Sequence, residues 1–362
     1  MKAPAIGALA AGIALAAIAA AGPSPAASVI LQERSAAPPN NFCDRACLDG
    51  FSDRYMAALV AHDTKAAIFA KDVRFSENNV MLKIGDALWK TISSKGGPDT
   101  ELHFADVTAQ TAGYYGMVRE RDYTAYYGMR LKIVDGKIAE VETMLARVAP
   151  RPAGAATAGP GGGGGGAGFT PSTPETFRHF PGFGDILPVA QRSGRGRYRD
   201  VVNGYWSTMQ LNDGAMFAPF SDDCMRIESG FLTSGGNLPN GNRRPSCGEQ
   251  FATGGYRTDT DVSDRDFLVV DEEKGLVLGS FQINHNAVAK TLANIRGEVR
   301  PSNQRSPSSF TALELFKVVN GKIARIEAIA ITPPYHMPAA WRRADADVAD
   351  FSATAAWNGG DK

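Results

Sequence analysis

Alternating apolar and polar residues mark two stretches that are nearly the same, "IVDGKIAEVETM" from Ile133 and "VVNGKIARIEAI" from Val318. Asp-Gly stands at the centre of the first and Asn-Gly at the centre of the second. These residues tolerate a positive φ, which tight hairpin turns require. Alternating runs rich in β-branched residues flank both turns, so the pattern predicts two β-hairpins of one design.

A helical period precedes each hairpin. Residues 49–60 place Phe51, Tyr55, Ala58 and Leu59 on one face, and residues 200–211 form the counterpart. The stretches that follow, "AHDTKAAIFAKDVRFSEN" and "LNDGAMFAPFSDDCMRIES", also correspond. The matching order predicts an internal duplication whose second copy is longer, mostly within 229–250 and 287–309.

Within the corresponding stretches we match individual residues. His62 aligns with Asn212, and the aspartate that follows each is expected to cap a short second helix. Arg74 aligns with Arg226, with Glu77 and Glu228 close behind. An arginine and a glutamate in both copies favour a role in bracing a sheet.

Composition divides the chain into segments. An apolar, alanine-rich run follows Lys2 and ends in small residues near Ala27, which predicts a signal peptide, with an uncleaved membrane anchor as the alternative. Six consecutive glycines lie in a predicted linker. The expected organisation is a signal peptide (1–27), a loose arm (28–42), a first domain (43–148), the linker (149–168), a second domain that opens with an extended segment at 169–199 (169–341), and a C-terminal tail (342–362).

Charge and cysteine content limit the partners and the compartment. The 38 basic and 38 acidic residues balance, so no net field favours nucleic acid, or a membrane after signal cleavage. Four cysteines in an exported chain predict two disulfides, Cys43–Cys47 and Cys224–Cys247, and a periplasmic or secreted location. The first bridge requires a helix that starts after Cys43. The cysteine spacing fits no zinc pattern, and no metal site is expected.

"ALVAHD", "DVRF" and the closing "DGKI" hairpin resemble the SnoaL-like, nuclear-transport-factor-2-like (NTF2-like) superfamily over residues 44–147 and, more loosely, 198–334. The resemblance implies an α+β fold in which a curved antiparallel sheet and packed helices form a cone around a pocket, here twice in tandem. Members include cyclases, dehydratases, isomerases, ester hydrolases and proteins that only bind. It also implies sheet-to-sheet dimers, so we expect a homodimer or a pseudo-dimer within the chain.

Strand alternation identifies one ionisable group on an apolar face. Met129 in the first copy corresponds to Glu314, which shares its face with Phe316 and Val318. A buried carboxyl has a raised pKa and can serve as a general base. A salt bridge with an inward arginine is the alternative.

Further candidates follow the same reasoning. His285 shares a face with Phe281 and is predicted to pair with Glu314 as a catalytic unit, or to be a hydrogen-bonded rim residue. Glu228 is a candidate proton carrier, and Arg226 a candidate anchor for a phenolate or carboxylate. His103 is the comparable histidine of the first copy, and Glu142 and Glu327 are expected to be structural. The predicted substrate-binding residues are Arg226, Tyr205, Trp206, Tyr256 and Phe281.

Together these residues predict an exported acid–base enzyme for a small aromatic molecule. No Gly-x-Ser-x-Gly elbow or P-loop occurs, and the glycine run "GPGGGGGGAG" is no dinucleotide fingerprint, because neither a strand before it nor a helix after it is indicated. We therefore expect no cofactor and favour a lyase over a hydrolase. The resemblance suggests formaldehyde-releasing C–C cleavage of a lignin-derived aromatic dimer. A non-catalytic binding protein and a carbohydrate-cleaving enzyme with paired Glu228 and Glu314 are the alternatives.

Overall fold

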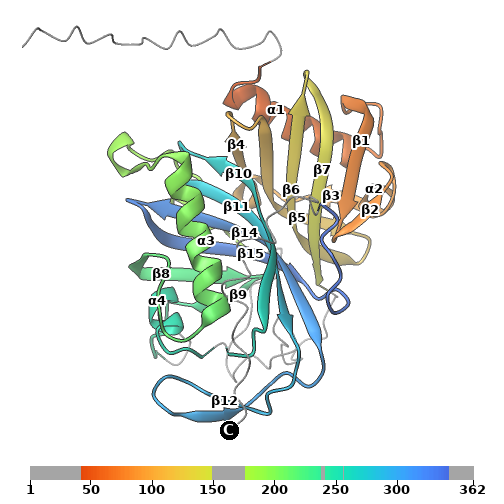
Figure 1. The fold of residues 1–362 in the computed structure, drawn as a ribbon. Coiled ribbons are helices and arrows are strands. Elements are labelled where there is room, and N and C mark those ends of the chain that lie inside the picture. Colours follow the sequence, from red (N-terminus) through yellow and green to blue (C-terminus); the bar gives the residue numbers. More distant parts are fainter. Residues whose placement is uncertain (1–41, 149–175, 238–240, 256, 342–362) are drawn as a thin grey trace, which may run out of the picture. The chain divides into compact units, whose positions relative to one another are not determined.

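The computed structural model describes residues 42–148, 176–237, 241–255 and 257–341. The signal peptide, most of the arm, the glycine-rich linker and the C-terminal tail lie outside these residues. The helices and strands in chain order (Figure 1) are α1 (Arg45–Val60), β1 (Phe69–Glu77), β2 (Val80–Leu82), α2 (Leu88–Thr91), β3 (Ile92–Lys95), η1 (Pro98–Thr100), β4 (Leu102–Asp106), β5 (Thr111–Glu120), β6 (Tyr123–Val134), β7 (Lys137–Val148), η2 (Val189–Gln191), α3 (Arg195–Leu211), β8 (Phe220–Glu228), β9 (Phe231–Ser234), α4 (Cys247–Phe251), β10 (Asp261–Asp271), β11 (Leu276–His285), β12 (Thr291–Ala293), β13 (Val299–Pro301), β14 (Ser308–Val319) and β15 (Lys322–Ile331).

Two large sheets have the same strand order. The first runs β2-β1-β7-β6-β5-β3, with β4 also on β5, and the second runs β9-β8-β15-β14-β11-β10. In each, the strand after the long helix pairs in parallel with the last strand of the closing hairpin. The sheets are therefore mixed, and the expectation of purely antiparallel sheets was wrong. Mixed sheets with few helices are consistent with the NTF2-like fold.

Both predicted hairpins form, β6–β7 and β14–β15, and each carries a register shift at its turn end. The turn residues Asp135 and Asn320 adopt φ values of 49° and 53°. These are left-handed conformations that Asp and Asn accept at low cost. Local turn chemistry thus fixes how the last two strands of each sheet meet.

The two long helices begin earlier than their periodic patterns suggest, at Arg45 and Arg195. Asp44 caps α1 by accepting from the backbone N–H of Cys47, and Cys43 precedes the helix. This start satisfies the condition for the Cys43–Cys47 disulfide, which is present with a Cα–Cα distance of 5.1 Å. None of the helices within the described residues is long and apolar enough to cross a membrane.

The expected helix caps after the long helices were wrong. Asp63 and Asp213 each accept a hydrogen bond from the backbone N–H two residues ahead, at Lys65 and Ala215. This is a turn stabilised by an Asx side chain rather than a helix start. The short helices α2 and α4 come later in the chain.

Three apolar clusters hold the structure together. One lies between α1 and the first sheet, and one between α3 and the second sheet. The third takes its residues from both sheets, including Phe104 and Tyr115 from the first and Leu313 and Leu315 from the second. Tyr115 also donates a hydrogen bond to the carbonyl of Leu313 at 2.7 Å. The two sheets thus belong to one compact unit.

The segment before α3 is irregular, as expected, but it does not cover the second domain alone. Phe177, Phe180 and Phe183 are buried in the cluster that both sheets share. His179 lies 2.6 Å from Glu327 in the second sheet and 3.2 Å from the carbonyl of Thr100 in η1, which precedes β4 of the first sheet. The segment therefore joins the two sheets.

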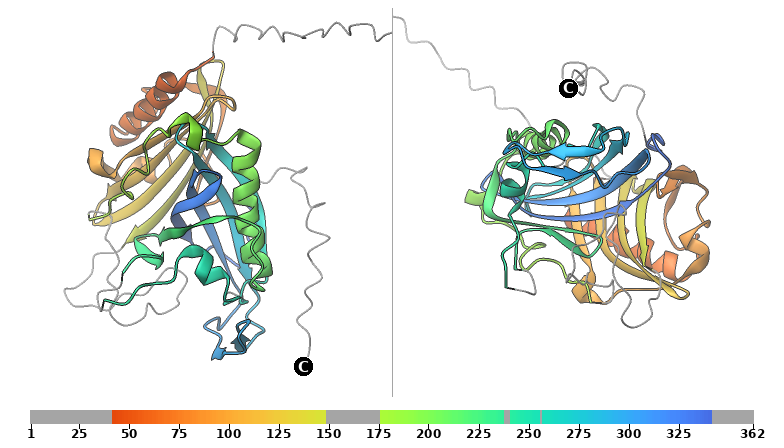
Figure 2. Two further views of the ribbon diagram at one scale, coloured as in Figure 1. Left: turned by 90° about the vertical axis from the view of Figure 1, so that its left-hand side faces the viewer. Right: turned by 90° about the horizontal axis from the view of Figure 1, so that it is seen from below.

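The additional residues of the second half form a separate element. β12 and β13 pair as a two-stranded hairpin, which extends from one end of the second sheet (Figures 1 and 2). The loop that follows contributes Asn303 and Gln304 to the cavity described next.

Candidate active site

A cavity of about 190 Å³ lies in the second half of the chain. Its walls come from the helices α3 and α4, the sheet strands β8, β11, β14 and β15, and the loops before β10 and β14. Aromatic side chains supply much of its apolar surface, and ionisable side chains gather at one part of the wall. The aromatic residues are Tyr205, Phe251, Phe281 and Phe310.

Glu314 extends from β14 into this cavity and is 2% exposed. Its Oε1 accepts a hydrogen bond from the Tyr205 hydroxyl at 3.2 Å. Its Oε2 is buried and has no hydrogen-bond partner among the residues that the structure describes. Burial raises the pKa of Glu314 to about 8, opposed by Arg226 and reinforced by Glu228. At neutral pH the group is therefore mainly a neutral acid, with its unpartnered oxygen buried in the cavity wall.

Arg226 is the cation of the site, and its nitrogens are engaged by the protein. Nη1 donates to the Tyr205 hydroxyl at 3.0 Å, and Nη2 donates to Gln250 at 2.9 Å. Nε contacts Thr233 at 2.9 Å and Glu228 at 2.7 Å. With its donors used in this way, Arg226 orients Tyr205 and balances Glu228. The geometry gives little support to the predicted role as a substrate anchor.

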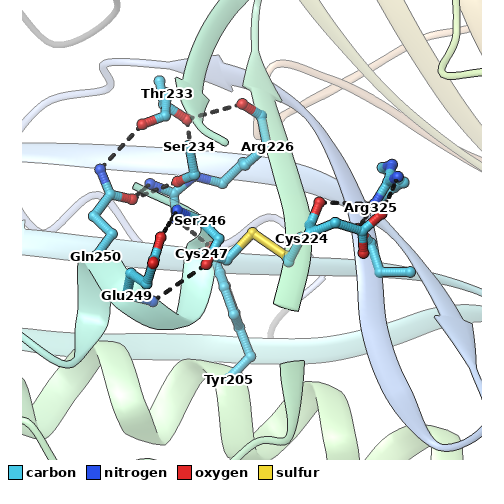
Figure 3. Close-up of a disulfide and its surroundings, with 12 residues drawn as sticks. Tyr205, Cys224, Arg226, Thr233, Ser234, Ser246, Cys247, Glu249, Gln250 and Arg325 are labelled. Atoms are coloured by element: carbon cyan, nitrogen blue, oxygen red, sulfur yellow. Dashed lines mark hydrogen bonds and ion pairs between the residues drawn. A yellow bond between two sulfur atoms is a disulfide. The ribbon is translucent and has the colours of Figure 1, made fainter. Parts of the chain in front are cut away.

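A disulfide fixes the residues that hold Arg226. Cys224 on β8 is bonded to Cys247 at the start of α4, with a Cα–Cα distance of 5.3 Å. Figure 3 shows Gln250 of α4 and Tyr205 of α3 on the two sides of the Arg226 guanidinium. Ser246 caps α4 in a capping box with Glu249. The bridge thus ties the strand that carries the cation to the helix that orients it.

His285 lines the cavity, but its partner is Asp259 and not Glu314. Nδ1 lies 3.1 Å from the carbonyl of Thr258 and 3.4 Å from Oδ1 of Asp259. Because a carbonyl only accepts, Nδ1 carries the hydrogen of the neutral ring and Nε2 is the basic nitrogen. Burial lowers the pKa of His285, which keeps the ring neutral. The predicted His285–Glu314 pair is therefore wrong in its geometry.

Sequence reasoning missed Asp259. Burial raises its pKa to about 7, and the charges of Arg226 and Glu228 also act on it. Asp259 precedes β10, whose pairing with β11 places Asp261 opposite Asn284. Extending that hairpin backward would have brought residues 259–260 beside His285. The register shifts within the hairpin hide this relation in the sequence.

Of the remaining predicted residues, some line the cavity and others lie elsewhere. Phe281 lines the cavity. Trp206 does not: it packs in the core against Phe267, Phe281 and Phe316. Tyr256 lies outside the described residues. In the first half, His103 lies 3.0 Å from Asp53 on α1.

The strand registers correct the pairing of arginines. Ile138 and Ile323 close the two hairpins opposite Ile133 and Val318. Two residues after these isoleucines stand Glu140 and Arg325, which are therefore equivalent. Arg74 pairs with Glu140 and Met225 pairs with Arg325, so Arg74 corresponds to Met225. By the same count Arg226 corresponds to Phe75 and Glu228 to Glu77. A shift of one residue moves a side chain to the other face, which is why Arg74 is exposed and Arg226 buried.

The two twin glutamates are structural, as expected. Glu142 lies 3.3 Å from Arg130, and burial raises the pKa of Glu142 to about 7. Glu327 pairs with His179 and accepts from the backbone N–H of Phe180. Within the described ranges, no group of three or more His, Cys, Asp or Glu side chains is arranged to hold a metal ion.

Comparison with known proteins gives a limited match. The model of a domain of unknown function (DUF8021) matches residues 191–330, which contain the whole second sheet apart from one residue of β15. No curated protein matches the chain. The matched domain therefore coincides with the half that holds the cavity.

Several solved structures are similar to part of the chain at low identity. A "putative polyketide cyclase" from Xanthomonas campestris pv. campestris is 19% identical over 38% of this chain and 92% of that one, with a TM-score of 0.24. A "putative ketosteroid isomerase" from Kribbella flavida DSM 17836 is 16% identical over 31% and 86%, with a TM-score of 0.21. An NTF2-like protein from Cytophaga hutchinsonii ATCC 33406 is 16% identical over 38% and 99%, with a TM-score of 0.22. At these scores we draw no functional conclusion from the neighbours.

Proposed function

We propose that the cavity of the second sheet is the active site of an acid–base enzyme that acts on a small aromatic molecule. The observation that carries the proposal is Glu314, a buried carboxyl in the cavity wall whose Oε2 has no partner within the described part of the chain. Its pKa of about 8 lies near neutral pH, where a group both donates and accepts protons efficiently.

The neighbours of Glu314 support proton transfer. Tyr205 holds Oε1, which leaves Oε2 without a partner among the described residues. Arg226 lies on the other side of Tyr205 and stabilises negative charge that develops along this hydrogen bond. The neutral His285 supplies a second base in the same cavity. In this arrangement Glu314 and His285 exchange protons with the substrate at two points.

The cavity supports an aromatic substrate of about one ring. Its volume of about 190 Å³ is near that of a cavity of about 150 Å³ known to admit benzene. The second ring of an aromatic dimer would have to lie outside it. We propose a lyase, in which a proton is removed from the substrate and the electron pair left behind forms a new double bond as the adjacent C–C bond breaks. The electron pair of the broken bond stays on the departing carbon, which then takes up a proton.

Export and duplication complete the proposal. We infer that the two sheets, which share strand order and closing hairpins, descend from one domain, with domains at 43–148 and 169–341. The two disulfides are compatible with an extracellular location. The acid–base residues of the proposal, Glu314 and His285, belong to the second copy.

The test is turnover of one-ring aromatic compounds that carry an acidic C–H bond. The protein is incubated with each compound in D₂O, and NMR follows both deuterium exchange and cleavage. We expect exchange that falls at least about 100-fold in Glu314→Gln. Glu142→Gln, a matched loss of a buried carboxyl in the first sheet, should retain the wild-type rate. Equal rates in wild type and folded Glu314→Gln would contradict the proposal, and binding without exchange would favour a binding protein.

A further inference from the structure

The polar wall of the cavity contains more acceptors than free donors. Glu228, Asp259 and Glu314 present carboxyl groups, and His285 presents a basic nitrogen. The donors of Arg226 contact Tyr205, Gln250, Thr233 and Glu228, and the Tyr205 hydroxyl donates to Glu314. The amides of Asn303 and Gln304 supply both kinds of group. Once Glu314 and Asp259 are ionised, a ligand that completes this wall must therefore bring hydrogen-bond donors.

The lining residues of this wall include more carboxyl groups than positively charged groups. Three carboxyl groups share one arginine, and the histidine ring is neutral. Buried carboxylates without a countercharge are costly, and such groups take up protons instead. Burial raises the pKa of both Glu314 and Asp259, to about 8 and about 7. A cation in the cavity would let both groups ionise.

The aromatic residues add a second feature that suits a cation. Tyr205 and Phe251 meet edge to face with ring centroids 5.4 Å apart, and Phe281 and Phe310 also line the cavity. Aromatic faces attract ammonium groups, and the attraction grows when the groups are desolvated. The Oε2 of Glu314, which is buried and has no partner in the described residues, is an unsatisfied polar atom in the same wall.

We infer that the substrate of this site is a small aromatic ammonium ion, whose charge is balanced by the Glu228, Asp259 and Glu314 carboxyl groups of the cavity wall. This inference rests on the proposed function and specifies its substrate class. Binding of the ion converts Glu314 from an acid to a carboxylate, so that the substrate itself generates the base. The groups that face Glu314 are Tyr205 from α3 and Arg226 and Glu228 from β8. Those that face Asp259 are Thr258, His285, Arg226 and Glu228.

The test compares three one-ring probes of different charge, which are benzylammonium, benzyl alcohol and benzoate. Calorimetric titration at pH 6 and pH 8, in two buffers of different ionisation enthalpy, gives affinity and proton release. We expect benzylammonium to bind tightest and to gain at least about tenfold in affinity from pH 6 to pH 8, since ionisation of one group changes affinity by up to about tenfold per pH unit. It should release about one proton or more, whereas benzyl alcohol should release none.

Variants assign the released protons. Glu314→Gln and Asp259→Asn should each reduce proton release and flatten the pH dependence, and Glu142→Gln should change neither. Thermal unfolding establishes that each variant is folded. Tighter binding of benzyl alcohol or benzoate at pH 8, or benzylammonium binding without proton release, would overturn the inference. If the inference fails in this way, Glu314-dependent deuterium exchange with neutral compounds would still support the proposed enzyme activity. Conversely, selective binding of benzylammonium without deuterium exchange on any compound would contradict the enzyme activity and leave the preference for an ammonium ion in place.

Discussion

The two sheets use matching positions for opposite purposes. At three positions around α1 the first sheet places Phe75, Tyr127 and Met129, each at most 1% exposed. Counted from the closing hairpins, the second sheet has Arg226, Ala312 and Glu314 there. Arg226, which forms an ion pair, thus stands in place of Phe75. Ala312 stands in place of Tyr127, and Glu314 in place of Met129. The comparison shows how one framework gives a filled core in one half and a polar cavity in the other.

The long helices differ less. Tyr55 in α1 packs edge to face against Trp89 at 5.4 Å, as Tyr205 in α3 packs against Phe251 at 5.4 Å. The Tyr55 hydroxyl accepts a hydrogen bond from the Trp89 indole, whereas the Tyr205 hydroxyl links Arg226 to Glu314. A tyrosine that stabilises the first core therefore serves the polar site in the second.

The largest expected effect comes from a variant that gives the second sheet the core residues of the first and so removes its cavity. We expect Ala312→Tyr/Glu314→Met to fill the cavity and weaken benzylammonium binding by at least about 100-fold, or about 3 kcal/mol. The melting temperature should rise, because a void and a buried ionisable group are both removed. Titration calorimetry and thermal unfolding measure the two effects. Retained binding in the double variant would show that the ligand occupies another place.

Two alanine substitutions test whether Arg74 and Arg226 occupy different positions in the two sheets. Arg226→Ala should cost about 3 kcal/mol in free energy of unfolding, since it leaves Glu228 without its partner in a buried site. Arg74→Ala should cost no more than about 1 kcal/mol, because Arg74 is exposed and its nearest carboxylate oxygen, on Glu140, is 3.9 Å away. Its guanidinium also lies over the Trp341 ring at 4.3 Å, which is a weak contact at an exposed site. Urea unfolding gives both values. Similar costs for the two substitutions would contradict the assignment.

The last effect develops gradually and lies in the pH dependence of stability. The pKa of Glu314 rises from an ordinary 4.5 to about 8 on folding, so between these values the folded state binds more protons. The contribution of Glu314 protonation to the free energy of unfolding is complete below about pH 4.5. It is lost as pH rises toward 8, with a slope of up to about 1.4 kcal/mol per pH unit. Glu314→Gln should therefore be most stabilised relative to wild type near pH 9. Parallel unfolding curves for the two proteins from pH 5 to pH 9 would refute this.

Much of the fold follows from local signals in the sequence. Asp-Gly and Asn-Gly between alternating runs predict the hairpins, because few other residues accept the turn conformation. The apolar face that contains Phe316 and Val318 also predicts that Glu314 is buried, because side chains alternate strictly along a strand. Cysteine spacing and compartment predict both disulfides. These features need only the chain neighbours of each residue.

The sequence by itself thus determined the turns, the long helices, the disulfides and the inward position of Glu314. Only the tertiary structure decided that Arg226 corresponds to Phe75, that Asp259 and not Glu314 meets His285, and that Trp206 belongs to the core. These relations join residues that are distant in the chain, and their registers pass through bulges whose positions packing selects. A shift of one residue there exchanges the two faces of a strand, and local composition does not encode it.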